Sequence, residues 1–285
     1  VTISDGAINI VSVFENSPAQ KAGMKIGDKI VAVDGETANA DNYQESINKI
    51  KGVNAEEGDS DVVVTVERGG ERIDMTVVRD TVSVDTVYSK VLNPNIGYIR
   101  ITDFGQKTDV DFKNQLDRLT ADGIKGLIID LRNNPGGMLT TVVNIADELL
   151  PEGVILTVRD KSGKENQYKS NNDCMSVPLC VLINGNSASA SEVLSGAIRD
   201  HGRGKLIGEK SFGKGVVQSI VEFGDGSAFK LTTAKYYTPS GECIDQTGIK
   251  PDIEVKLGDA ASKKQISELT LEEDEQLRTA LQVLN

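Results

Sequence analysis

The sequence contains one histidine, three cysteines and no hydrophobic run of 18 residues or more. Without such a run, no segment is long and apolar enough to predict a membrane-spanning helix. One histidine and three scattered cysteines lack the spacing of a zinc site. The cysteines Cys174, Cys180 and Cys243 are odd in number, which argues against an obligatory disulfide framework. We therefore expect neither a metal nor another cofactor.

Positive charge is in deficit, because 31 Lys and Arg residues stand against 43 Asp and Glu residues, for a formal net charge of −12. Phosphate backbones are bound through basic surfaces, so this balance argues against a nucleic-acid partner. At 285 residues the chain is long enough for two domains. It begins without an initiator Met, so the lack of a visible signal peptide says little about cellular location.

The single histidine, His201, limits how a serine could be activated as a nucleophile. Residues 177–183 (VPLCVLI) form an apolar run typical of a buried strand, and a turn and a helical apolar stripe follow. Ser187 or Ser189 can cap that helix, with Glu192 placed as in a capping box. His201 follows Ser189 by 12 residues along the helix. That spacing is about 18 Å, which is too far for proton transfer.

A lysine is then the economical candidate for the base. Lys214 follows Ser189 by 25 residues and lies in a glycine-flanked turn before a strand-like segment at 216–222. Gln218 comes four residues after Lys214, so in a strand both side chains point to the same face. A lysine desolvated beside a serine has a lowered pKa and can accept its proton. Taken alone, the serine run is more typical of a cap or flexible loop, and an exposed lysine is normally just solvated.

Two other patterns are poorer matches. The G-x-S-x-G pattern of a nucleophile elbow is absent. Residues 208–215 match the G-x4-G-K pattern of a nucleotide-binding loop, and residues 127–130 imitate a Walker B strand. Gly215, however, stands where magnesium binding needs serine or threonine. A strand is also expected after Lys214, whereas a phosphate loop needs a helix N-terminus there. These departures argue against a nucleotide site.

Four motifs occur in order along the second part of the chain: DLRNNPGG at 130–137, SASASE at 187–192, FGKGVVQ at 212–218 and GIKPD at 248–252. Together they resemble the C-terminal processing peptidases, which are tail-specific, PDZ-containing serine proteases. Any one of the motifs alone would be a weak signal. Their order and their spread over more than a hundred residues make the resemblance specific.

The resemblance implies a role for each matching residue. Ser189, the middle serine of its motif, corresponds to the nucleophile, and Lys214 corresponds to the general base. Gln218 corresponds to the residue that orients the lysine. Gly137 and Ala190 correspond to the residues whose N–H groups stabilise the oxyanion. That role agrees with the position of Ala190 at a predicted helix start, where free N–H groups favour negative charge.

The first part of the chain shows a second, independent pattern. Residues 17–35 (SPAQKAGMKIGDKIVAVDG) resemble the core of a PDZ domain. Strands are expected at 8–14 and 29–33, a helix at 43–50, and a hairpin about Gly69-Gly70 from 62–67 and 72–79. PDZ domains add a chain terminus as an extra strand and hold its carboxylate in backbone amides. The resemblance places the carboxylate loop just before the first strand, so we expect this domain to be truncated at its start. The alternative is a small β-rich module without a ligand.

Further along, strand-like and helix-like patterns alternate, which indicates an α/β core. The fold class is thus a mixed α/β protein: a β-rich PDZ domain with two short helices, then a serine protease core. The resemblance adds a crotonase-like or Clp-protease-like architecture for the core. We expect an irregular surface loop at 161–172. The expected domains are the PDZ domain at 1–82, the protease core at 83–257 and a C-terminal helical segment at 258–285. That segment is either packed on the core or part of a homodimer interface.

The sequence therefore predicts a serine endopeptidase of the C-terminal processing type. Its substrates would be polypeptides that enter by their C-termini, with the PDZ domain as recognition element or gate. The alternative is a PDZ-containing scaffold whose protease-like core is catalytically silent. The resemblance also implies an extracytoplasmic location, in the bacterial cell envelope or secreted.

Overall fold

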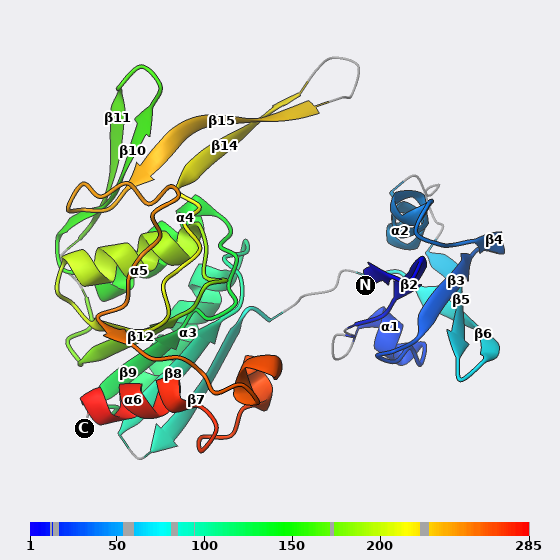
Figure 1. Cartoon of the computed structure of the whole chain (residues 1–285), viewed down its shortest axis with the longest axis horizontal. Helices are drawn as coiled ribbons and strands as arrows, with labels where there is room; N and C mark the ends of the chain where they lie inside the picture. The colour runs from blue at the N-terminus through cyan, green and yellow to red at the C-terminus, as the bar shows by residue number, and fades with distance from the viewer. Residues whose placement is uncertain are drawn as a thin grey trace. The chain divides into compact units, whose positions relative to one another are not determined.

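The computed structural model describes residues 1–11, 13, 17–53, 60–80, 85–93, 95–171, 174–222 and 228–284, with the backbone alone at 93, 218–222 and 230. The chain divides into two compact units, Val1–Val84 and Asp85–Asn285 (Figure 1). The expected combination of a β-rich first unit and an α/β second unit is confirmed. The boundaries at 82 and 257 stay predictions.

In its described residues, the first unit has one sheet and two helices. Its strands run in the order β1-β2-β3-β5-β6, and β4 pairs with β3. The elements are β1 (Thr2–Ser4), β2 (Ala7–Asn9), α1 (Pro18–Lys21), β3 (Lys29–Val33), β4 (Glu36–Thr37), α2 (Tyr43–Lys51), β5 (Asp61–Arg68) and β6 (Glu71–Val78). The expected strand at 8–14 is shorter, because β2 ends at Asn9; Ser12 and Phe14 lie outside the described residues.

Local sequence explains the clearest elements of this unit. Strand β5 alternates, so that Val62, Val64 and Val66 are buried in its core. The hairpin to β6 turns on Gly69 and Gly70, whose φ angles are +62° and +87°. A two-residue turn of this kind needs positive φ at both positions, which glycine adopts without strain. The predicted hairpin is therefore confirmed.

A buried carboxylate joins two segments of the first unit. Asp28 is almost fully buried and accepts hydrogen bonds from Nε and Nη2 of Arg68, each at 2.7 Å, and from the N–H of Lys25 at 2.8 Å. The hydrogen bonds from Arg68 hold the pKa of Asp28 below its ordinary value. A carboxyl with a depressed folded-state pKa stabilises the fold above its unfolded pKa, and that contribution is lost as the pH falls through the folded pKa.

We therefore expect Asp28→Asn to destabilise the first unit by about 1–3 kcal/mol at pH 7, because an amide cannot match the charge-assisted pair. The difference between the variant and the unmodified chain should shrink below about pH 4, where the carboxyl begins to protonate. Urea unfolding of the whole chain at pH 7 and pH 3 measures both effects. Equal stability of the two chains at pH 7 would contradict the argument.

The second unit is built on a six-stranded sheet with the order β16-β13-β12-β9-β8-β7. All neighbours pair in parallel except β7, which is antiparallel to β8. The strands are β7 (Val87–Asn93), β8 (Ile96–Ile101), β9 (Gly126–Asp130), β12 (Leu179–Ile183), β13 (Lys205–Gly208) and β16 (Ile253–Glu254). Every residue of β9 and β12 is buried, as expected for parallel strands that are covered on both faces.

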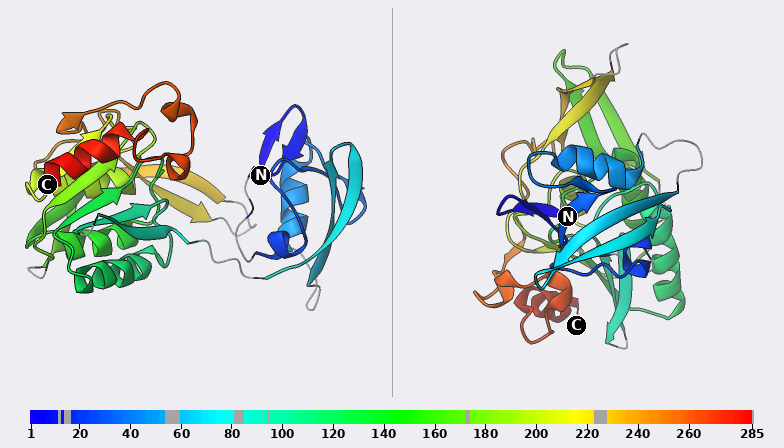
Figure 2. Two further views of the ribbon diagram at one scale, coloured as in Figure 1. Left: turned by 90° about the horizontal axis from the view of Figure 1, so that it is seen from below. Right: turned by 90° about the vertical axis from the view of Figure 1, so that its right-hand side faces the viewer.

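Helices cover both faces of this sheet (Figure 2). Helices α3 (Thr108–Ala121), α4 (Leu139–Leu149) and α5 (Ala190–Asp200) pack on one face, where they share the larger apolar core with Ile129, Val181 and Leu206. Helix α6 (Glu275–Leu284) packs on the other face, where Leu277 and Ala280 contact a separate cluster that includes Ile128, Cys180 and Leu182. No helix in the described part of the chain is long and apolar enough to cross a membrane.

A second, antiparallel sheet of four strands has the order β11-β10-β15-β14 and extends away from the core (Figure 1). Its strands are β10 (Gly153–Asp160), β11 (Glu165–Ser170), β14 (Val216–Glu222) and β15 (Ala228–Tyr237). The expected irregular loop at 161–172 is wrong for residues 165–170, which pair with β10 as β11. Residues 161–164 form the turn before it, and residue 172 lies outside the described residues. Four of the six residues of β11 are exposed, so the strand lacks the apolar alternation that would have predicted it.

The C-terminal segment is less helical than expected. Two short 3₁₀ turns, Ala261–Lys263 and Ile266–Glu268, precede α6, and only the last ten described residues form an α-helix. The leucines that suggested a helical tail are partly used by α6, whose Leu277, Leu281 and Leu284 pack against the sheet. This packing covers the apolar side chains of α6. The homodimer stays a prediction.

Candidate active site

Three of the four sequence motifs begin where neighbouring parallel strands end. The DLRNNPGG motif follows β9, the SASASE motif follows β12, and the FGKG motif follows β13 after a short connection. These strands are adjacent in the sheet. Loops at the carboxyl ends of adjacent parallel strands meet at one edge, which is where α/β proteins place their sites. Sequence segments up to 84 residues apart, from Asp130 to Lys214, are thereby brought to one edge.

Ser189 is the N-cap of α5 and has an unusual backbone, with φ +55° and ψ −112°. Positive φ is costly for a residue with a Cβ, and such residues persist where the surrounding structure holds them, often at functional sites. Ser187 and Ser191 are fully buried, and their hydroxyls donate to the carbonyls of Leu131 and Asn134, each at 2.9 Å. Ser189 is partly exposed, and its hydroxyl donates to no acceptor among the described residues. Ser189 thus differs from Ser187 and Ser191 both in the exposure and in the hydrogen bonding of its hydroxyl.

Gly137 and Ala190, the two predicted oxyanion donors, have backbone N–H groups without a hydrogen-bond acceptor in the described residues. The loop that carries Gly137 lies directly against the serine, because a Cβ on Gly136 would come within 2.7 Å of Cβ of Ser189 and 3.0 Å of the Ala190 nitrogen. Free N–H groups beside a serine hydroxyl are the arrangement that stabilises a tetrahedral oxyanion.

Asn134 fastens this loop to the serine segment. Its side chain, fully buried, donates to the carbonyl of Ile101 at 2.9 Å and accepts from the N–H of Gly136 at 2.9 Å. Its carbonyl accepts from the N–H of Ala188 at 3.0 Å as well as from the hydroxyl of Ser191. Asn134 therefore holds the glycine loop and the serine segment in place together.

Glu192 connects the segment of Ser189 to the segment of Lys214. Its carboxylate is fully buried and accepts four hydrogen bonds. Oε1 accepts from the hydroxyl of Ser211 at 2.6 Å and the N–H of Gly213 at 2.7 Å. Oε2 accepts from the N–H groups of Ser189 and Lys214, each at 2.8 Å. The capping-box pattern indicated the bond to Ser189, but only the fold brings residues 211–214 to the same carboxylate.

Lys214 is held at the site by its backbone, while its side chain is exposed. Among the described residues, its ammonium group makes no hydrogen bond or ion pair. The backbone of Gln218 is part of β14, opposite Thr232 on β15. The side chain of Gln218 lies outside the described part of the structure. The proposed contacts between Ser189, Lys214 and Gln218 therefore stay predictions.

The rival assignments do not fit this geometry. His201 follows the last residue of α5, at the end opposite Ser189, and its Nε2 lies 2.8 Å from the carbonyl oxygen of Val154. The lysine turn commits the N–H groups of Gly213 and Lys214 to Glu192, and a strand follows it, so those amides are not presented to a phosphate. No group of three or more His, Cys, Asp or Glu side chains in the described residues could hold a metal ion.

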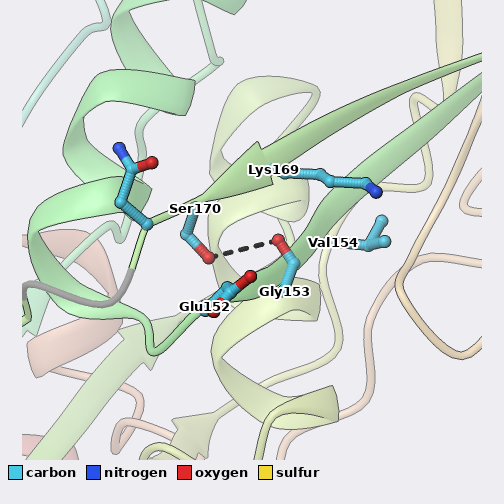
Figure 3. A pocket seen from close by; sticks show the side chains of 6 residues that line it. Glu152, Gly153, Val154, Lys169 and Ser170 are labelled. Carbon is cyan, nitrogen blue, oxygen red and sulfur yellow. Dashed lines mark hydrogen bonds between the residues drawn. The ribbon is translucent and has the colours of Figure 1, made fainter.

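A separate open pocket of about 600 Å³ lies where β10 begins and β11 ends (Figure 3). Among its lining residues, the hydroxyl of Ser170 donates to the carbonyl of Gly153 at 3.2 Å. The residues that line it are Glu152, Gly153, Val154, Lys169, Ser170 and Asn171. None of the predicted site residues is among them, so this hollow is distinct from the candidate active site.

The fold joins a small β-rich unit to an α/β core, and the core carries the candidate serine site at the carboxyl ends of its parallel strands. The chain belongs to peptidase family S41: the family profile matches residues 95–255, and a PDZ domain profile matches residues 1–78. Both assignments confirm the resemblance seen in the sequence.

Curated relatives carry consistent names. The chain is 38% identical over 260 residues to the carboxy-terminal processing protease CtpA of Bacillus subtilis, covering 90% of this chain and 55% of that protein. It is 38% identical over 267 residues to the carboxy-terminal-processing protease of Bartonella bacilliformis, covering 90% and 60%. A solved structure, the photosystem II D1 C-terminal processing protease, matches with a TM-score of 0.58 and 32% identity, over 89% of this chain and 69% of that one. The chain thus spans little more than half the length of these curated relatives.

Proposed function

We propose that this protein is a serine endopeptidase of the C-terminal processing type. Oγ of Ser189 attacks the carbonyl carbon of a peptide bond while Nζ of Lys214 takes its proton. The N–H groups of Gly137 and Ala190 hold the oxyanion, and each donor contributes roughly 3–4 kcal/mol in comparable sites. Lys214 then gives the proton to the leaving amine, and water hydrolyses the acyl-enzyme to release the acid and free Ser189.

One observation carries this proposal: the partly exposed Ser189, at a strained helix start, lies against the loop of Gly136 and Gly137, and the N–H groups of Gly137 and Ala190 have no acceptor in the described structure. Membership of a serine peptidase family supports the interpretation. Because a lysine acts as a base only when its charged form is disfavoured by burial, we propose that a bound polypeptide covers the exposed Lys214. In the same proposal, Gln218 orients the lysine.

The proposed substrates are polypeptides that enter by their C-termini. The PDZ unit supports this, since such domains bind chain ends by adding them as a strand. It would recognise the substrate terminus or gate the site. The names of the relatives are consistent with this use. We propose an extracytoplasmic location because the family resemblance of the sequence implies it.

Cleavage of an unfolded protein such as casein tests the mechanism. Ser189→Ala and Lys214→Ala should each lower kcat/KM by at least ~10³-fold, because the nucleophile and its base act as a unit. Lys210→Ala is the matched control, since Lys210 is an exposed lysine in the same connection and its loss should leave cleavage unchanged. Cleavage that survives Lys214→Ala would show that another base acts. A chain that is folded but cleaves nothing would favour the silent scaffold.

The same assay separates catalysis from substrate recognition. Two unstructured peptides that differ only in a free or amidated C-terminus are compared at equal concentration. Lower KM for the free carboxylate is the expected result if the PDZ unit recognises chain ends. Equal KM values would contradict that role without bearing on the proposed catalytic roles of Ser189 and Lys214.

A further inference from the structure

Arg132 is fully buried, and its guanidinium group is completely paired. Nε and Nη2 donate to the carboxylate of Asp130, with the Nη2–Oδ2 distance 2.6 Å. Nη1 and Nη2 donate to the two carboxylate oxygens of Asp274, each at 2.8 Å, and Nη1 also donates to Oε1 of Gln276 at 3.0 Å. A two-pronged pair of this kind fixes both position and orientation of the guanidinium.

The two carboxylates come from segments far apart in the sequence. Asp130 ends β9, and the hydroxyl of Tyr98 donates to it at 2.7 Å. Burial opposes the charged form of Asp130, but the charge and hydrogen bonds of Arg132 outweigh burial, so the pKa of Asp130 lies below its ordinary value. Asp274 lies 142 residues from Arg132 and immediately precedes α6. Its Oδ1 also accepts from the N–H of Leu277 at 3.0 Å, which caps the helix.

The position of Arg132 in the chain links this pair to the candidate active site. Arg132 directly precedes the loop 133–137, which carries the free N–H of Gly137. The next residue, Asn133, has a φ of +60°, and Asn134 fastens the loop to the serine segment. Because the loop starts at a side chain held by α6, displacement of α6 would move its origin. It would also leave a buried guanidinium without half of its acceptors, which proteins tolerate poorly.

We propose that Asp274 is a positioning residue for the peptidase reaction: the cap of the C-terminal helix holds Arg132, and Arg132 holds the loop that presents the Gly137 N–H to the oxyanion. The inference rests on the proposed function. It makes α6 a part of the catalytic apparatus although α6 lies on the opposite face of the sheet from α5. A positioning role for Asp274 differs from general stabilisation, because the loop acts on the transition state more than on the bound substrate.

The test compares Asp274→Asn with Leu281→Ala in the whole chain. Asparagine still caps the helix but loses the charge and one carboxylate oxygen for Arg132. Leu281→Ala weakens the apolar packing of α6 and leaves the pair with Arg132 in place. For Asp274→Asn we expect kcat to fall about 10–100-fold with KM within about threefold, as for a loss felt only in the transition state. A peptide aldehyde, which forms an oxyanion on Ser189, should bind more weakly by the same factor. Asp274→Glu, which keeps the charge, should recover part of kcat.

Amide hydrogen exchange over residues 131–138 gives a readout independent of activity. Exchange in this loop should rise in Asp274→Asn and not in Leu281→Ala. If Asp274→Asn leaves kcat and loop exchange unchanged, or if Leu281→Ala lowers kcat as much at equal loss of stability, the inference is overturned. An unmodified chain without peptidase activity would instead refute the proposed function, and loop exchange would still decide whether Asp274 controls the loop. Should Asp274→Asn fail to fold, Asp274→Glu carries the same comparison.

Discussion

Glu192→Gln is expected to lower kcat/KM by at least about 10²-fold, an effect close to that of losing a catalytic group. The Glu192 carboxylate accepts four hydrogen bonds, two on each oxygen. Glutamine has one oxygen, and its NH₂ group would face backbone N–H donors in either orientation. If the amide nitrogen replaces Oε2, the N–H groups of Ser189 and Lys214 both lose their acceptor. Each unsatisfied buried donor costs about 1–3 kcal/mol, so the nucleophile and lysine segments should separate.

The measurement is casein cleavage together with urea unfolding of the whole chain. Glu209→Gln is the control, because it removes the same charge from a half-exposed position in the neighbouring connection. It should change neither activity nor stability by a measurable amount. Activity of Glu192→Gln within about twofold of the unmodified chain would show that the shared carboxylate does not position the dyad.

Gly137→Ala is expected to abolish measurable cleavage and to destabilise the second unit. A Cβ at this position would overlap the carbonyl oxygen of Phe104 and come within 2.7 Å of its carbonyl carbon. The φ of Gly137 is +147°, which a residue with a Cβ rarely adopts. The loop must therefore move, and the N–H of Gly137 with it. Loss of one oxyanion donor alone lowers kcat by about 10²–10³-fold.

Gly163→Ala is the matched control for backbone strain. Its φ is +85°, but a Cβ there meets no atom within 4 Å, and the turn lies between β10 and β11. We expect a cost of about 1–2 kcal/mol in stability and no change in cleavage. Cleavage by a folded Gly137→Ala chain at the unmodified rate would contradict the oxyanion assignment.

Much of the local structure could be predicted from the sequence. The apolar runs of β9 and β12 identify buried strands, and Gly69-Gly70 identifies a hairpin, because these signals depend on neighbouring residues alone. Strand β11 could not be found in this way, since its residues ENQYKS show no apolar alternation. It is a strand because β10 offers an edge to pair with, which no local pattern reports.

For the candidate site, too, the local sequence predicts one part and the tertiary structure the other. Its motifs can be read in order, and they identified the family and the candidate residues. The choice of Ser189 over Ser187 and Ser191 rested on the resemblance, and the structure adds a physical reason in the buried hydrogen bonds of its neighbours. The importance of Asp274 had only a weak signal, an acidic residue before an amphipathic helix.

By itself, then, the sequence determined the family, the mixed α/β class and the presence of a PDZ unit, and it supplied the candidate site residues. These properties depend on local patterns and on the identity of short motifs. Only the tertiary structure decided that Glu192 joins the serine and lysine segments, and that Asp274 reaches Arg132 across 142 residues. Contacts at such separation depend on how the whole sheet packs. Buried charges at those positions are stable only when the fold delivers their partners.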